Sequence, residues 1–248
     1  MNEKDFYRLA VLDEKMWYFK SIHLRMAYWI EQMMPHKALK LLECGCGTGG
    51  LIKFILKKKP DLMIVGLDIS FLACKLSQQK IKASFTAGSI ESLPFIENCF
   101  DAIIISDTIC QVDNPTLVFQ NLARTVKPGG YIFINEPAFK WLWSYHDEAY
   151  QTKRRFSGQE LILLAKKNGF IPIFITYVNF FIFPIFLLRR KLFPPKEAKS
   201  DVRIYPEPFE TIMMAISRLE LLMHKIRCPY PVGSSVFLVA KKAKNILV

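Results

Sequence analysis

An apolar run leads directly into a cluster of glycines in the segment LLECGCGTGG, residues 41–50. Gly45, Gly47 and Gly50 match the pattern G-x-G-x-x-G, in which a strand turns tightly into a helix and leaves backbone amides free for a ligand. Such a turn is typical of an α/β fold that binds a nucleotide-like ligand at the carboxyl edge of its sheet. The segment therefore predicts a first strand at 38–44 followed by a helix.

Short apolar runs alternate with helix-like segments after this turn. Residues 62–68, 101–106 and 131–135 have the continuous apolar character of buried parallel strands. Further strands are expected at 171–178 and 234–242. The alternation predicts an α/β fold: a doubly wound, Rossmann-like, mostly parallel seven-stranded sheet with helices on both faces.

We expect one domain over residues 1–248, because 51% of its residues are hydrophobic and a chain of this length can bury a sizeable core. Its expected parts are an N-terminal helical cap (1–37), a cofactor-binding core (38–168) and C-terminal strands with an apolar helical insertion (169–248). An amphipathic helix is expected near 209–227, and core packing is favoured over a partner site for its apolar stripe. That stripe consists of Phe209, Ile212, Met213, Ile216, Leu219, Met223 and Ile226.

The composition of the chain indicates which kinds of partner the protein binds, whether it holds a metal and where it is located. The chain has 34 Lys and Arg against 22 Asp and Glu, a net charge of +12, which favours anionic partners such as nucleic acid, acidic substrates or an anionic membrane face. The six cysteines show neither a C-x-x-C pair nor Cys/His ligand spacing, so we expect reduced thiols and no metal. The N-terminus lacks the pattern of a secretory signal, which predicts a cytoplasmic protein.

Glu43 distinguishes between two ligands for the glycine turn. A carboxylate two residues before Gly45 would repel a pyrophosphate, because like charges a few ångströms apart in a partly desolvated crevice cost several kcal/mol. It would attract the α-ammonium and sulfonium groups of S-adenosylmethionine. Asp68, at the end of the second strand, can accept both hydroxyls of an adenosine ribose. The charge pattern favours the sulfonium ligand.

Together, these motifs resemble those of class I S-adenosylmethionine-dependent methyltransferases, and the resemblance covers nearly the whole chain. The segments that show it are LLECGCGTGG, GLDIS, GSIESLPFIENCFDAIIISDTICQVDNP, LARTVKPGGYIFINEPA and VGSSVFLVAKK. The resemblance implies S-adenosylmethionine as the cofactor. It places the methionine portion at Glu43, Gly45 and Gly47, the ribose and adenine at Asp68 and Ile69, the adenine edge at Ser89 and Ile90, and the sulfur end at Asp107 and Thr108.

Two positions depart from the family pattern. Ser89 stands where relatives commonly have Asp, so the contact to the adenine amino group falls to a weaker side chain or to the backbone. After the strand at 101–106, Cys110 and Gln111 replace the Glu-His pair of many relatives. An amide cannot accept a proton at neutral pH, so Gln111 is excluded as a general base.

The segment after the strand at 131–135 contains the candidates for acceptor chemistry. Its Trp-Ser-x-His-Asp stretch resembles a subgroup associated with surface glycan, lipid or quinone-like pathways. His146 beside Asp147 suits a general base for an alcohol or phenol, since imidazole titrates near neutrality. The alternative is a hydrogen-bonded loop histidine followed by an acid that caps a helix.

Cationic and aromatic residues could bind the acceptor. Arg154 and Arg155 could both bond to a carboxylate or phosphate, or instead begin a solvated basic helix. Trp17 and Phe19 resemble the aromatic N-terminal cap of the same subgroup.

Residues 170–188 form a long uncharged stretch, FIPIFITYVNFFIFPIFLL. A membrane span is disfavoured because Pro172, Asn179 and Pro184 interrupt it and both flanks are basic. We expect a buried strand followed by a Phe-rich helix. Two roles stay open for 180–193: a lid packed over the acceptor or a second subunit, and peripheral contact with the inner membrane face.

The leading hypothesis is methyl transfer to a small-molecule acceptor, through an oxygen of a lipid-linked, glycan or quinone-like compound. One alternative is a nucleic-acid methyltransferase, which the charge supports but for which the sequence shows no added binding module. Another is a noncatalytic methyltransferase-like scaffold at a membrane surface, which the intact acids at both ends of the ligand site disfavour. A dinucleotide oxidoreductase is disfavoured by Glu43.

Overall fold

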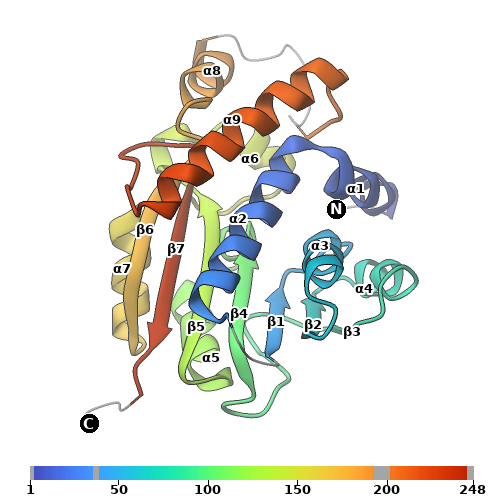
Figure 1. Cartoon of the computed structure of the whole chain (residues 1–248), viewed down its shortest axis with the longest axis vertical. Helices are drawn as coiled ribbons and strands as arrows, with labels where there is room; N and C mark the ends of the chain where they lie inside the picture. Colours follow the sequence, from blue (N-terminus) through green and yellow to red (C-terminus); the bar gives the residue numbers. More distant parts are fainter. Residues whose placement is uncertain (1–2, 36–38, 193–201, 245–248) are drawn as a thin grey trace.

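The computed structural model describes residues 3–35, 39–192 and 202–244, and its centre is a seven-stranded sheet (Figure 1). The strand order is β3-β2-β1-β4-β5-β7-β6, and only β7 runs antiparallel to its neighbours. The predicted mostly parallel, doubly wound sheet is therefore confirmed. The strands are β1 (Lys40–Cys44), β2 (Met63–Asp68), β3 (Ser84–Ala87), β4 (Phe100–Ser106), β5 (Val126–Pro137), β6 (Phe170–Val178) and β7 (Ser235–Lys242).

Helices cover both faces of this sheet. Figure 1 shows α2 and α9 in front of it, and α5 and α7 behind it. The helices and single turns are α1 (Glu3–Lys15), α2 (Trp17–Met33), α3 (Gly50–Lys58), α4 (Phe71–Gln78), η1 (Ile109–Gln111), α5 (Pro115–Thr125), η2 (Lys140–Leu142), α6 (Tyr145–Ala149), α7 (Gly158–Lys167), α8 (Phe183–Leu187), η3 (Leu188–Leu192) and α9 (Glu207–Lys225).

Strand β4 shows how the two hydrophobic layers form. Its side chains alternate in direction, so Ile103 and Ile105 join the cluster that includes Leu122 of α5, whereas Ala102 and Ile104 join the cluster beneath α2 and α3. All four are fully buried. A strand that is buried on both faces must be apolar at every position, which explains the uninterrupted run in the sequence.

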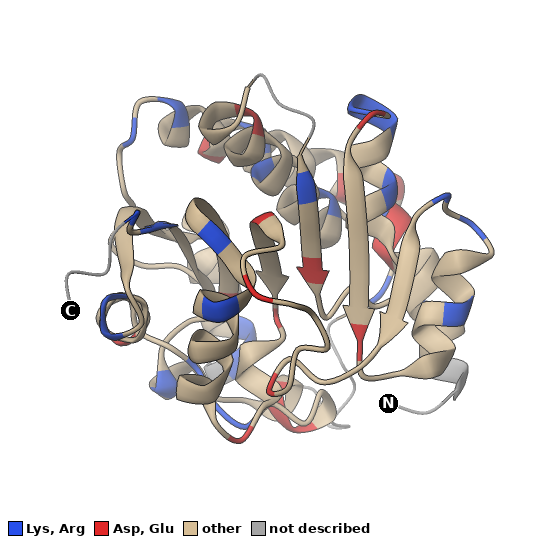
Figure 2. Ribbon diagram, turned by 90° about the horizontal axis from the view of Figure 1, so that it is seen from below, with Lys and Arg blue, Asp and Glu red and all other residues tan. Residues whose placement is uncertain are grey.

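The sheet order places a ligand crevice between β1 and β4. The chain winds outward from β1 to β3 in one direction and from β4 in the other, so the connections after β1 and β4 diverge at this point. Glu43 and Asp68 lie at the carboxyl ends of β1 and β2. Figure 2 shows Asp and Glu at the ends of several strands as well as on helices and loops, where most Lys and Arg also lie.

Capping residues and a glycine set the two ends of helix α7, as the sequence predicts. Ser157 and Glu160 form the reciprocal bonds of a capping box at the start of α7, and Gly169 adopts a left-handed φ of 79° after its end. The sequence missed β3, a four-residue edge strand that is half-buried or exposed along its length. It also placed the fifth strand at 131, whereas β5 begins at Val126.

The uncharged stretch divides as expected into strand β6 and the short helix α8, which continues into η3. Asn179 adopts a positive φ of 65° between them and donates to the Ser234 hydroxyl. Among the described residues, no helix is long and apolar enough to cross a membrane.

Helix α9 forms where predicted, but the packing expected for its apolar stripe is wrong. Of that stripe, only Met213 is buried, while Ile212, Leu219 and Ile226 are exposed. The remaining buried positions are polar: Glu210, Ser217, Glu220 and His224. Three of them accept hydrogen bonds from neighbouring segments: Glu210 from the Trp17 amide, Glu220 from the Phe180 amide and His224 from the Trp29 indole.

Candidate active site

A cavity of about 620 Å³ lies at the carboxyl ends of β1, β2, β4 and β5. This volume lies in the range of small-molecule sites. Side chains from α1, α2, α6, α8 and α9 complete its walls, so the N-terminal helices and the apolar insertion both face the sheet's ligand crevice. All nine predicted cofactor residues line it: Glu43, Gly45, Gly47, Asp68, Ile69, Ser89, Ile90, Asp107 and Thr108.

Glu43 provides a buried negative site at the end of β1. Only 6% of the residue is exposed, and burial, followed by the nearby Asp13 and Asp68 carboxylates, raises the pKa of Glu43 well above its usual value. Within the described part of the chain, its buried Oε2 atom has no hydrogen-bond partner. A buried carboxylate oxygen of this kind calls for a cationic donor, and the α-ammonium of S-adenosylmethionine fits that need.

Asp68 organises the glycine turn. Its Oδ2 accepts from the Gly47 amide at 2.8 Å, and its Oδ1 accepts from the Ser70 amide at 2.9 Å. Burial raises the pKa of Asp68, and these two amides oppose that shift. The same carboxylate therefore lines the cavity, where a ribose was predicted, and holds the turn in place.

The turn itself tolerates no larger residue at Gly45. Gly45 has a φ of 75°, and a Cβ there would lie 2.0 Å from Oγ1 of Thr108. Thr108 is fixed in turn by its bonds to the carbonyls of Cys44 and Ser106. Thr108, which was predicted at the sulfur end of the cofactor, thus also joins the ends of β1 and β4.

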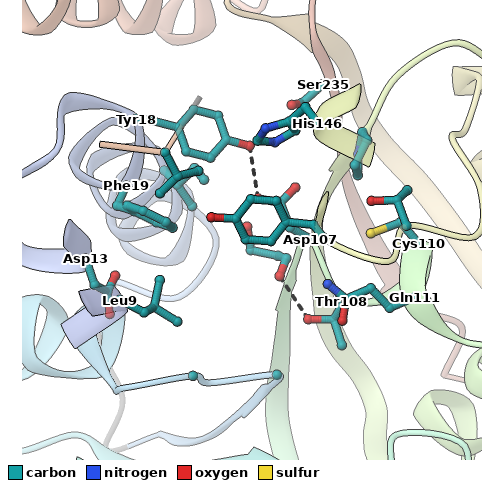
Figure 3. A pocket seen from close by; sticks show the side chains of 18 of the residues that line it. Leu9, Asp13, Tyr18, Phe19, Asp107, Thr108, Cys110, Gln111, His146 and Ser235 are labelled. Atoms are coloured by element: carbon teal, nitrogen blue, oxygen red, sulfur yellow. Dashed lines mark hydrogen bonds between the residues drawn. The ribbon is translucent and has the colours of Figure 1, made fainter. Parts of the chain in front are cut away.

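Asp107 and Tyr18 form a polar pair inside the cavity that the sequence analysis did not anticipate. The Tyr18 hydroxyl donates to Oδ2 of Asp107 at 2.9 Å (Figure 3). Burial raises the pKa of Asp107 to about 6, and the Tyr18 hydrogen bond and the charges of Arg155 and Arg25 limit that rise. Tyr18 is adjacent to both predicted aromatic cap residues, so only its hydroxyl distinguished it in the sequence.

Glu136 was also missed, and it shapes the segment after β4. It is fully buried at the end of β5 and accepts from the amides of Thr108, Ile109 and Cys110 at 3.1, 2.8 and 3.0 Å. These bonds fix turn η1 and hence Asp107. Burial, followed by the charge of Asp107, raises the pKa of Glu136 to about 8, against the effect of the three amides.

The acidic and basic candidates after β5 bind one another. Asp147 accepts from the Ser144 amide at 2.9 Å, and Arg155 donates Nε and Nη2 to its two carboxylate oxygens at 2.8 and 3.0 Å. Both side chains are almost fully buried. Each satisfies the other's charge, which gives the pair a positioning role, and both residues also line the cavity. The predicted substrate role of Arg155 and catalytic role of Asp147 stay predictions.

His146 and Arg154 differ in where they lie. His146 lines the cavity with its ring against Tyr150, and Figure 3 shows it beside Ser235 and Tyr18. Its role as a base stays a prediction. Arg154 donates to the backbone carbonyl of Asp113, and this bond fixes a loop.

A second, apolar part of the cavity lies beneath α8 and α9. Trp17 and Phe186 pack ring against ring at 6.2 Å, and Ile182 and Met213 belong to the same buried cluster. Phe19 lines the cavity as well. The aromatic cap and the apolar insertion, far apart in sequence, thus form one wall, to which Arg189 and Arg190 contribute.

Comparison with known proteins agrees with this geometry. Residues 42–134 match the model of a methyltransferase domain family. The chain is 34% identical over 147 residues to the biotin biosynthesis bifunctional protein BioHC of Teredinibacter turnerae, covering 52% of this chain and 26% of that protein. It is 28% identical over 108 residues to a demethylmenaquinone methyltransferase of Thermotoga maritima, covering 43% and 47%. The chain thus spans less than half of either relative.

Residues 42–134 thus carry a methyltransferase domain, and the fold and the site agree with the class I S-adenosylmethionine-dependent type. The fold of the chain is shared with a putative sarcosine dimethylglycine methyltransferase from Galdieria sulphuraria, at a TM-score of 0.58 and 18% identity over 90% of this chain and 87% of that one. S-adenosylmethionine is the family's cofactor, and the buried Glu43 oxygen and the pinned glycine turn of this methyltransferase fit it. The resemblance to the Trp-Ser-x-His-Asp subgroup stays a prediction.

Proposed function

We propose that this methyltransferase transfers a methyl group to an oxygen atom of a small acceptor with an apolar body, of the lipid-linked or quinone-like kind. The observation that supports this most directly is the composition of this cavity. Its acidic part, around Glu43 and Asp68, suits the cofactor, and its aromatic part, around Trp17 and Phe186, adjoins it. An apolar wall of this kind favours such acceptors over a free glycan.

The chemistry needs little from the protein beyond placement and charge. When bound, S-adenosylmethionine supplies a methyl group on a positively charged sulfur. Glu43 would hold the ammonium group of the cofactor, Asp68 its ribose, and the glycine turn the rest of its methionine portion. The walls from α2 and α8 exclude water and orient the acceptor, which converts the transfer into a reaction between two fixed groups.

An acceptor hydroxyl must also lose a proton. Two groups that line the cavity can take it: the Asp107 carboxylate, held by Tyr18, and the imidazole of His146. With a pKa raised to about 6, Asp107 is mostly ionised at neutral pH yet more basic than an ordinary aspartate. Figure 3 shows the His146 ring near the Tyr18 hydroxyl that donates to Asp107, so both groups would serve an acceptor oxygen held in this part of the cavity.

The test uses S-adenosylmethionine with an isotopically labelled methyl group and a panel of phenols, hydroquinones and lipid extracts. Label that moves into the organic phase in an alkoxy group, identified by mass spectrometry and NMR, supports the proposal. A Glu43→Lys variant serves as the control that lacks cofactor binding. Transfer to nucleic acid instead would favour the alternative substrate class. Cofactor binding without transfer to any acceptor would favour the scaffold alternative.

A further inference from the structure

Helix α9 turns most of its polar residues inward and several apolar residues outward, which indicates that its outer face binds a partner. Its inward face carries charge: Glu210 accepts from the amide of Trp17 at 2.6 Å, at the start of α2, and Glu220 accepts from the amide of Phe180 at 3.0 Å. His224 is fully buried beside Trp29, and burial lowers its pKa to about 3, so it is neutral. The polar face of α9 is thus used for internal hydrogen bonds.

Four apolar residues, three on α9 and one directly after its end, lie outside instead. Ile212, Leu219 and Ile226 recur every seven residues and are 54%, 52% and 71% exposed, and Leu222, between the last two, is 51% exposed. Single exposed apolar residues are ordinary, but a row of them on one side of a helix marks an interaction surface. We call these four residues the α9 stripe.

The charges around the α9 stripe identify the partner. Between residues 202 and 227, the exposed cations are Arg203, Arg218, Lys225 and Arg227, whereas Glu207 is the exposed acid of the same described segment. An apolar strip bordered by cations is the arrangement with which helices lie in the headgroup region of an anionic bilayer. A second copy of the chain would bring the same positive surface against itself.

The start of α9, next to the α9 stripe, borders the acceptor side of the cavity. Phe209, in the first turn of α9, is 37% exposed and lines the cavity, as do Tyr205 before it and Met213 after it. Arg189 and Arg190 of η3 line the same region. A molecule held in the headgroup layer beside α9 would therefore lie near the apolar part of the site.

We propose that the α9 stripe and its flanking cations dock this methyltransferase on an anionic lipid surface, from which an amphiphilic acceptor enters the cavity. The docking surface proposed here lies on α9, and the membrane contact expected at 180–193 stays a prediction. The entry of the acceptor rests on the proposed function, whereas docking does not, since it is measured without cofactor or acceptor. No helix of the described residues spans a membrane, so the contact is peripheral.

The experiment is flotation of the full chain with phosphatidylcholine vesicles, with and without phosphatidylserine. Binding is expected only with the anionic lipid and should weaken as salt is raised. The double variant Leu219→Gln/Leu222→Gln should weaken it about tenfold or more, because two leucines that enter the headgroup region contribute at least the 1.4 kcal/mol to which tenfold corresponds. Arg218→Gln/Lys225→Gln should remove much of the preference for anionic lipid.

The matched control is Met63→Gln/Leu163→Gln, two residues that are 64% and 54% exposed on other elements, β2 and α7. It should bind vesicles like the unaltered protein. Titration with S-adenosylhomocysteine checks that every variant is folded. Failure to bind anionic vesicles, or equal binding by the Leu219 and Leu222 variant, would overturn the proposal. So would a dimer, seen by light scattering, that this variant dissociates. Vesicle binding without methyl transfer would leave docking intact and remove the proposed function.

Discussion

Replacing Glu43 by Gln should weaken the binding of only one part of the cofactor. Glu43 is the acid at the end of β1, and its buried Oε2 atom has no partner among the described residues. A hydrogen bond to a charged group contributes about 1.5–3 kcal/mol, so the loss of the carboxylate should weaken the binding of S-adenosylhomocysteine roughly ten- to a hundred-fold. Methylthioadenosine lacks the amino-acid portion, and its affinity should stay nearly unchanged.

Calorimetric titration with both ligands measures this difference, and its pH dependence gives a second test. The pKa of Glu43 is raised in the free protein, and an ammonium beside it favours the ionised form, so binding should expel a proton. The affinity for S-adenosylhomocysteine should therefore rise with pH, and Glu43→Gln should abolish that slope. Equal losses for both ligands, or no loss for either, would refute the assignment of Glu43 to the ammonium.

Three further perturbations test the surroundings of the site. Tyr18→Phe removes a hydrogen bond that lowers the pKa of Asp107, so the acidic limb of the pH–rate profile should move above about 6; an unmoved limb would exclude Asp107 as the base. Arg155→Met leaves the Asp147 carboxylate buried without its cation and should cost about 3–5 kcal/mol in urea unfolding. Adding Asp147→Asn should restore part of that, and strictly additive losses would contradict the pairing. For Glu136, whose folded pKa of about 8 exceeds the ordinary 4.5, the stability it contributes should be lost as pH rises through 8. Between pH 4.5 and 8, the free energy of unfolding of Glu136→Gln should therefore vary less with pH than that of the unaltered protein. An unchanged slope would show that Glu136 does not cause this pH dependence.

The cofactor side of the site could be predicted from sequence because its residues sit at fixed places in the fold. Strands buried on both faces need continuous apolar runs, and a parallel sheet brings their carboxyl ends to one edge. Glu43 and Asp68 were therefore placed together although 25 residues separate them. The sign of their charge then selected the ligand, with no need of side-chain detail.

The acceptor side resisted prediction because its contacts join distant segments. Asp147 was paired with its sequence neighbour His146, but its carboxylate is bound by Arg155, which the fold brings back from the loop after α6. Glu136 follows a strand and resembles any other loop acid until three amides converge on it. Such roles depend on tertiary geometry, which periodicity and spacing do not encode.

The inverted packing of α9 links this part of the fold to the chemistry. Glu210 of α9 binds the backbone amide of Trp17, and the next residue, Tyr18, donates to Asp107 in the cavity. A shift of α9 would therefore move the start of α2 and, with it, the hydroxyl that limits the pKa of Asp107. The polar face of this helix positions the site, which leaves its apolar face to turn outward. One amphipathic helix thus joins the outer surface to the reacting end of the cavity through two hydrogen bonds.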